Sequence, residues 1–107
     1  MTNKDKVDYL RNYHWTLENI KLINERLERG DKYTNKEDLE RRLSHALKSK
    51  DKIESLIHGI KDERLALLLE LTYIEDLPLD SVAERMGLSY SRITKLHIKA
   101  LNELKIS

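Results

Sequence analysis

Residues that break helices are nearly absent from this chain of 107 residues, which contains three glycines and one proline. Glycine and proline are the residues that interrupt regular structure most strongly. They fall at Gly30, Gly59, Pro78 and Gly87, and between them apolar residues recur at spacings of three and four, which is typical of helices. With 39% hydrophobic and 36% charged residues, the sequence predicts an all-α fold with a modest core rather than a disordered chain.

The charge and the cysteine content exclude several classes of protein. Lys and Arg number 20 against 19 Asp and Glu, a net charge of +1, so a uniformly basic, histone-like binder is excluded and any nucleic-acid surface must be local. The absence of cysteine excludes disulfides and thiolate metal sites. No apolar run is long enough to span a membrane, and the first residues lack the apolar core of a signal peptide. We therefore expect a cytoplasmic protein, in the cytosol of a bacterial host, with no membrane partner.

Residues 1–60 have the pattern of a long helical hairpin. The first helix, over 5–29, carries a heptad-like stripe that has Asn24 at one seam position and otherwise consists of Leu10, Tyr13, Leu17, Ile20 and Leu27. Gly30 is a natural helix stop, Gly30–Asn35 is typical of a polar turn, and Asn35 is a natural N-cap for a second helix. The stripe of that helix is interrupted by Lys50 and otherwise consists of Leu39, Leu43, Ala46, Ile53, Ile57 and Ile60.

Stripes this narrow need a partner, which is either the sister helix or a second protomer. Together with the short chain, they predict a homodimer whose interface lies on the hairpin. Two interpretations remain open for Asn24 and Lys50: they select one register of the seam, or they mark a solvated end of the hairpin. For Trp15 we expect packing in the core or in a dimer interface rather than a stacking role.

Residues 61–107 are expected to form a second unit. A third helix, from Lys61 to about Asp76, contains the run LALLLELTYI, which is apolar on two sides and therefore predicts burial between two layers. Pro78 ends it, and a short helix starts at Leu79 and stops at Gly87. Ser89 then caps a longer helix that runs from Tyr90 to about Leu104. Two unequal helices joined by a tight turn that contains glycine predict a helix-turn-helix.

The faces of the last helix suggest what it binds. Its core stripe is Ile93, Leu96, Ala100, Leu101 and Leu104, and a partly buried, hydrogen-bonded His97 is expected at the edge of that stripe. The other face carries Ser91, Arg92, Lys95, Lys99 and Asn102. A helix in the DNA major groove presents its N-terminal residues to the base edges, so Arg92 is suited to guanine and Ser91 or Tyr90 to a base or a thymine methyl. The candidate DNA-binding residues are Ser89, Tyr90, Ser91, Arg92, Lys95, Lys99 and Arg85, with the two lysines facing phosphates.

The segment from Leu68 to Leu104 resembles the region-four helix-turn-helix of sigma factors. More narrowly, it is similar to small late-transcription regulators of phages of Gram-positive bacteria, the RinA/ArpU-like group. The residues that carry the resemblance are Tyr73-Ile74, Val82-Ala83-Glu84-Arg85, Leu88 to Arg92, Leu96-His97, Ala100-Leu101 and Leu104. LuxR-type DNA-binding domains share much of this pattern, and Leu79 stands where several relatives carry tryptophan.

This resemblance implies a DNA-binding transcriptional regulator that acts with RNA polymerase or a sigma factor. By position, Tyr90, Ser91, Arg92 and Lys95 match residues that contact bases or the DNA backbone, and Glu84-Arg85 match positions that face phosphate or a protein partner.

The sequence contains no phosphate-binding glycine loop, nucleophile elbow or metal-ligand spacing, so we expect a non-enzyme without cofactor or metal. The alternative to DNA binding is a helical protein-interaction module, which would dock on RNA polymerase, a sigma factor or another regulator. The near-neutral net charge motivates that alternative.

Overall fold

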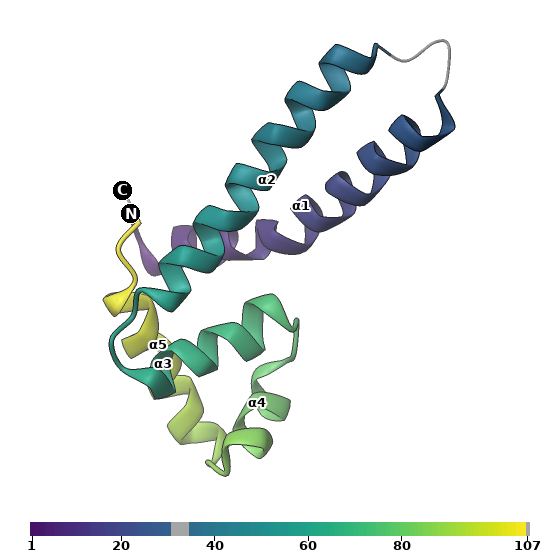
Figure 1. The fold of residues 1–107 in the computed structure, drawn as a ribbon. Helices are drawn as coiled ribbons and strands as arrows, with labels where there is room; N and C mark the ends of the chain where they lie inside the picture. Colours follow the sequence, from purple (N-terminus) through teal and green to yellow (C-terminus); the bar gives the residue numbers. More distant parts are fainter. Residues whose placement is uncertain (31–34, 107) are drawn as a thin grey trace.

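The structure is a computed structural model that describes residues 1–30 and 35–106. Within these ranges every regular element is helical, which confirms the predicted all-α class. A long hairpin projects from a cluster of shorter helices (Figure 1). The elements are α1 (Asn3–Arg29), α2 (Lys36–His58), α3 (Glu63–Leu69), the π-helical η1 (Glu70–Ile74), α4 (Leu79–Met86) and α5 (Tyr90–Glu103). None of the helices in the described ranges is both long enough and apolar enough to cross a bilayer.

The hairpin helices begin and end at local signals that the sequence carries. Thr2 caps α1: its hydroxyl accepts from the Asp5 N–H, and the Asp5 carboxylate accepts from the Thr2 N–H, both at 3.1 Å. Gly30 ends α1 in the left-handed conformation, at φ 60°. Asn35 caps α2 by accepting from the Asp38 N–H at 3.2 Å, as predicted. The predicted turn over Gly30–Asn35 falls mainly on residues 31–34, which lie outside the described residues.

The apolar seam of the hairpin is closed by the sister helix, and its course differs from the predicted heptad frame. Ile23 is only 1% exposed, whereas Asn24, placed in the seam by the heptad, faces solvent. The buried residues of α1 follow one another at steps of three, three and seven. Each of these steps is less than a whole number of 3.6-residue turns, so the buried stripe moves to preceding positions towards Gly30. The buried seam residues are Leu10, Tyr13, Thr16 and Ile23 of α1 and Leu39, Ala46, Ile53 and Ile57 of α2.

Two further expectations for the hairpin are affected by the structure. Of the two placements expected for Trp15, packing in the core is wrong, because the residue is 70% exposed on α1, and packing in a dimer interface stays a prediction. Lys50 does not mark a solvated end: it is half-buried, and its Nζ lies 3.1 Å from Glu54 Oε1. The Tyr13 hydroxyl donates to the other oxygen of Glu54 at 2.7 Å, which links α1 to α2. This bond lowers the pKa of Glu54, and burial raises the pKa of Tyr13 to about 12.

The third helical segment begins at Glu63 rather than at the predicted Lys61, after an Asp62 cap. It continues without a break from α3 into η1. Burial on two sides is confirmed only in part, because Leu67 is 43% exposed. The buried residues are Leu65, Leu68, Leu69, Leu71 and Tyr73, and they join the hairpin residues and the last two helices in one hydrophobic cluster. The segment therefore connects the two predicted units through a shared core. The boundary predicted at residues 60–61 lies in the turn between α2 and α3.

The start of α1 is also bonded to the end of α5, although the two are far apart in sequence. Lys6 Nζ donates to the carbonyl of Leu101 at 2.8 Å, and the side chains of Asn3 and Asn102 are hydrogen-bonded at 3.1 Å. Figure 1 shows both chain ends at the base of the hairpin. Because a cation near a helix C-terminus is stabilising, Lys6 fastens the hairpin to the C-terminal helix.

The Tyr13–Glu54 bond yields a stability prediction. Tyr13→Phe should lower the free energy of unfolding at pH 7 by about 1–2 kcal/mol, since it removes a half-buried hydrogen bond to a charged group. A carboxyl group whose folded-state pKa is lowered contributes stability above its unfolded pKa and loses it as the pH falls through the folded value. The loss caused by Tyr13→Phe should therefore shrink as the pH falls below the ordinary pKa of a carboxyl group and Glu54 takes up a proton. Urea unfolding followed by circular dichroism at pH 7 and at a series of acidic pH values measures it.

Tyr9→Phe is the matched control, because Tyr9 also lies on α1 and is partly buried but its hydroxyl has no hydrogen bond within the described chain. Its effect should stay below about 0.5 kcal/mol. Equal losses of unfolding free energy in Tyr13→Phe and Tyr9→Phe would contradict a stabilising hydrogen bond between Tyr13 and Glu54.

Candidate nucleic-acid interface

The unit formed by α4, a tight turn and α5 is built as the sequence predicts. Gly87 ends α4 at φ 68°, a backbone conformation that costs glycine little. The Leu88 N–H donates to the Ala83 carbonyl at 2.9 Å and closes the turn. The Ser89 hydroxyl accepts from the Arg92 N–H at 3.2 Å and caps α5. This helix ends at Glu103, one residue before the predicted Leu104, which is its C-cap.

Burial of one side of α5 determines which of its residues face outward. Ile93, Ala100 and Leu101 are buried on this helix, and Val82 and Ala83 are buried on α4. The small side chain of Ala83 lets the two helices approach closely. Every candidate DNA-binding residue lies outside this core and is exposed: Arg85 on α4, Ser89 at the cap, and Tyr90, Ser91, Arg92, Lys95 and Lys99 on α5.

Four of the candidates lie together on the outer side of α5, and we call Ser91, Arg92, Lys95 and Lys99 the basic strip. Their spacings of three and four residues bring them to one side of a helix with 3.6 residues per turn. Within the described residues, none of the three cations of the strip is in an ion pair. The strip is therefore a solvated cationic surface, and Arg85 adds a further exposed cation at the end of α4.

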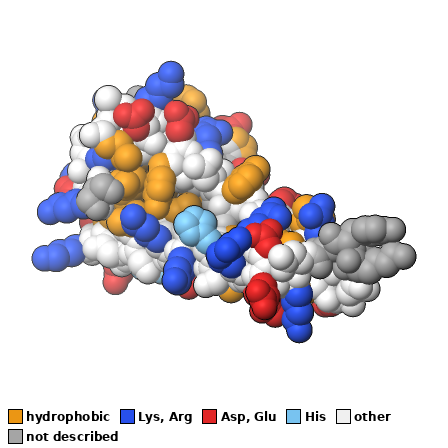
Figure 2. Space-filling view, turned by 90° about the horizontal axis from the view of Figure 1, so that it is seen from above, with side chains coloured by type: hydrophobic (Ala, Val, Ile, Leu, Met, Phe, Trp, Pro, Cys, Tyr) orange, Lys and Arg blue, Asp and Glu red, His pale blue; other side chains and the backbone are white. Residues whose placement is uncertain are grey.

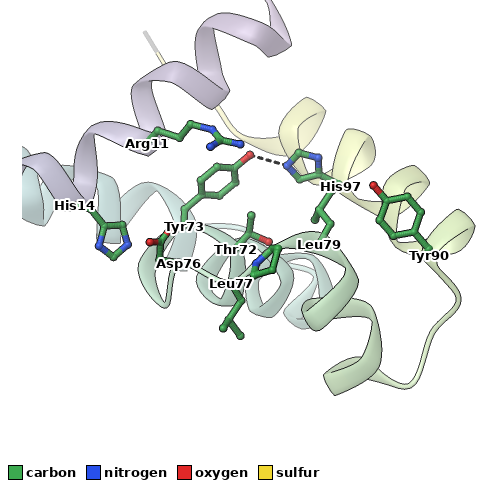
Figure 3. Close-up of a pocket in the computed structure, with 10 residues that line it drawn as sticks. Arg11, His14, Thr72, Tyr73, Asp76, Leu77, Leu79, Tyr90 and His97 are labelled. Carbon is green, nitrogen blue, oxygen red and sulfur yellow. Dashed lines mark hydrogen bonds between the residues drawn. The ribbon is translucent and has the colours of Figure 1, made fainter.

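Two candidates are placed differently from the strip. Tyr90 and Arg92 are two residues apart, so they are rotated by about 200° around the helix and point to nearly opposite sides. Tyr90 lines a hollow of about 530 Å³ with Arg11, His14 and Leu79 (Figure 3). The hydroxyl of Ser89 serves as the helix cap. The structure therefore does not bring Tyr90 together with the basic strip.

The hollow beside Tyr90 is closed by a tyrosine–histidine pair. Figure 3 shows the phenol oxygen of Tyr73, from η1, pointing to the ring of His97, from α5; it lies 2.7 Å from Nε2. The rings are stacked, with centroids 5.8 Å apart. Burial raises the pKa of Tyr73 to about 12 and lowers the pKa of His97. His97 is thus partly buried and hydrogen-bonded, as the sequence predicted.

The prediction missed an apolar member of the exposed surface and one contact made by the polar stripe. Ile98 is 54% exposed beside the strip, and the helical period that assigns Ile93 and Ala100 to the core already places it on the outside. Asn102 belonged to the predicted polar stripe, but its side chain is bonded to Asn3. No signal within the last helix could indicate that contact, because it joins opposite ends of the chain.

The buried pair yields a prediction about pH. Because burial lowers the pKa of His97, the unfolded chain takes up a proton first as the pH falls below about 6.5. The free energy of unfolding should decrease from about pH 6.5 downward until the folded-state pKa is passed. In His97→Gln this part of the pH dependence should flatten. Urea unfolding at a series of pH values measures it, with His45→Gln, an exposed histidine on the hairpin, as control. An unchanged slope in His97→Gln would contradict the assignment.

Comparison with known proteins gives a family for the chain. No curated protein and no solved structure matches it. The model of one protein family matches residues 25–105, which include the end of α1 and all of α2, α3, η1, α4 and α5. That match spans well over half of the chain, and the chain therefore belongs to the family described as "Protein of unknown function (DUF1492)".

Proposed function

We propose that the protein is a sequence-specific, double-stranded-DNA-binding transcriptional regulator of phage or prophage type. In this proposal α4 and α5 act as a helix-turn-helix and α5 enters the major groove. The observation that carries the proposal is the basic strip, whose three cations are exposed and, within the described chain, form no ion pair. A local cationic surface of this kind is what a chain of net charge +1 needs in order to bind DNA.

The order of residues along α5 fits docking in the major groove. Ser91 and Arg92 lie in the first turn, where a recognition helix meets base edges, and Arg92 can donate two parallel hydrogen bonds to guanine. Lys95 and Lys99 follow one and two turns later and are placed for phosphates. The exposed Ile98 adds an apolar group that suits a thymine methyl.

The start of α4 contributes less to this proposal. A helix N-terminus favours an anion, but Asp80 occupies the first turn of α4 and its carboxylate accepts from the Ser81 N–H at 2.8 Å. That negative charge opposes a phosphate at the same place. We therefore assign phosphate contacts on this helix to Arg85, at its other end.

The resemblance of Leu68–Leu104 to sigma region four and to RinA/ArpU-like regulators supports the same function. It also suggests RNA polymerase or a sigma factor as a protein partner, and a homodimer is proposed with it. A second candidate function is a docking module that binds such a partner without DNA. Trp15 and Leu22 favour it, because both are large apolar side chains exposed on the hairpin, away from the basic strip.

Replacement of the arginine tests the base contact. Duplexes that the wild-type protein selects from a random pool serve as specific DNA, and the unselected pool serves as non-specific DNA. Arg92→Ala should weaken specific binding by about 10- to 100-fold, the range for one bidentate base contact, and non-specific binding much less. Fluorescence anisotropy measures both affinities. Lys36→Ala, an exposed charge at the far end of α2, is the control and should bind like wild type. Equal weakening of specific and non-specific binding would contradict the proposed contact between Arg92 and a base.

Replacement of the lysines tests the phosphate contacts. Lys95→Ala with Lys99→Ala should weaken specific and non-specific binding by similar factors. The dependence of log affinity on log salt should become shallower by roughly 0.9 for each phosphate that the protein no longer neutralises. Titrations at several salt concentrations give that slope. If the wild-type protein bound no duplex at low salt yet co-purified with RNA polymerase, the docking function would replace the DNA-binding one.

A further inference from the structure

Closure of the hairpin seam leaves one outer side of α1 with large apolar groups in solvent. Trp15 is 70% and Leu22 is 42% exposed. Glu18 and Glu25 lie on the same side, because positions 15, 18, 22 and 25 repeat at spacings of three and four. We call these four residues the α1 ridge. It combines two apolar side chains with two carboxylates, and the buried core uses none of the four.

A groove of the opposite character lies between α1 and α2. It measures about 1030 Å³; Thr16, Ala46 and Ile53 form its buried floor, and Tyr9 and Trp15 contribute to its α1 side. Its α2 side carries the cations Arg41, Arg42 and Lys52 and the imidazole of His45, and none of the described residues that line it is acidic. Both arginines are paired with Asp38 of their own helix, whereas Lys52 has no ion pair within the described chain. We call this the hairpin groove. In the space-filling view, hydrophobic side chains gather on this face of the molecule, with Lys and Arg along one edge of them and Asp and Glu near the other (Figure 2).

The ridge and the groove are complementary in charge, in apolar character and in spacing. Glu18 and Glu25 are seven residues apart on α1, and His45 and Lys52 are seven residues apart on α2. Seven residues are two helical turns, a rise of about 10.5 Å, so both carboxylates of one helix can face both basic residues of the other at once. Trp15 and Leu22 would then cover the apolar floor of the groove.

We propose that the occupant of the hairpin groove is the α1 ridge of a second copy of this chain. Both surfaces are present on the same hairpin, so a two-fold axis makes the contact twice, ridge in groove and groove over ridge. Trp15 lines the groove and also belongs to the ridge, which places it beside the axis, where the two copies meet. This inference concerns only the hairpin and does not rest on DNA binding by α5.

The only tryptophan of the chain reports directly on this interface. As the protein concentration rises from about 1 μM to about 1 mM, a range in which modest interfaces assemble, the mass measured by sedimentation should double. The emission of Trp15 should shift to shorter wavelength over the same range, because the indole leaves water. Trp15→Ala should raise the dimer Kd by about 30-fold or more, as for a central aromatic anchor. Its fold should remain intact by circular dichroism, since the side chain is exposed.

Charge exchange tests the pairing of the two surfaces. Glu18→Lys with Glu25→Lys makes the ridge basic, and His45→Glu with Lys52→Glu makes the groove acidic. Neither His45 nor Lys52 is in an ion pair within the described chain, so the second change spares the hairpin itself. Each variant alone should stay monomeric at concentrations where the wild type dimerises. A mixture of the two should form a heterodimer, because each ridge then meets a groove of opposite charge.

Glu84→Lys with Glu103→Lys is the matched control for the ridge variant. It makes the same change in net charge as Glu18→Lys with Glu25→Lys, but at exposed positions outside the hairpin, and it should dimerise like wild type. The proposal is overturned if the wild-type protein is monomeric throughout the concentration range. It is also overturned if Trp15 emission is independent of concentration, or if the mixed variants fail to associate while both are folded. DNA binding measured on the same samples tests the proposed function separately, and a monomer that binds DNA would refute only the dimer.

Discussion

Burial of one side of α5 against the rest of the molecule is the constraint on which the other features depend. Ile93, Ala100 and Leu101 enter a hydrophobic cluster that also contains Leu10 of α1 and Leu68 of α3. Such close-packed interiors resist rotation of a helix about its axis. The outward direction of Arg92 and Lys95 is therefore a result of packing, although neither residue takes part in it.

Hydrogen bonds at the margins of this cluster fix which residues of neighbouring helices face one another. The Tyr13–Glu54 bond joins the two hairpin helices, the Tyr73–His97 pair joins η1 to α5, and Lys6 joins the start of α1 to the end of α5. Apolar contacts alone tolerate sliding, whereas hydrogen bonds require particular partners at particular distances. In each case a helix is held to one that is distant in sequence, so the hairpin and the α4–α5 unit keep one relative placement.

The parts of the fold that depend on local chemistry could be predicted from the sequence. Gly30, Gly87, Asn35 and Ser89 end or begin helices through their own backbone freedom or side-chain oxygens, and the structure has each of them in that role. The core stripe of α5 followed from its helical period in the same way.

The features that depend on other parts of the chain were predicted less well. Ile23 replaced Asn24 in the seam because the course of the stripe depends on how two long helices cross. The bond between Asn102 and Asn3 ties the end of the polar stripe to α1 through a contact across almost the whole chain. The rotation of Tyr90 away from Arg92 follows from the helical period, but the hollow that it lines is formed with residues of α1 and η1 and could not be anticipated. For the candidate site, exposure could thus be anticipated residue by residue, whereas the grouping of side chains required the tertiary structure.

The π-helical turn between α3 and Asp76 affects the direction of the side chains within it. A π-turn holds one residue more than the α-helical turn it replaces, and each residue of an α-helix advances the rotation by about 100°. Tyr73 lies within this turn, and its hydroxyl reaches His97 from there. A chain one residue shorter within Glu70–Ile74 would carry the tyrosine at a different rotation about the helix axis. Insertions and deletions at this point would therefore act first on the contact between η1 and α5.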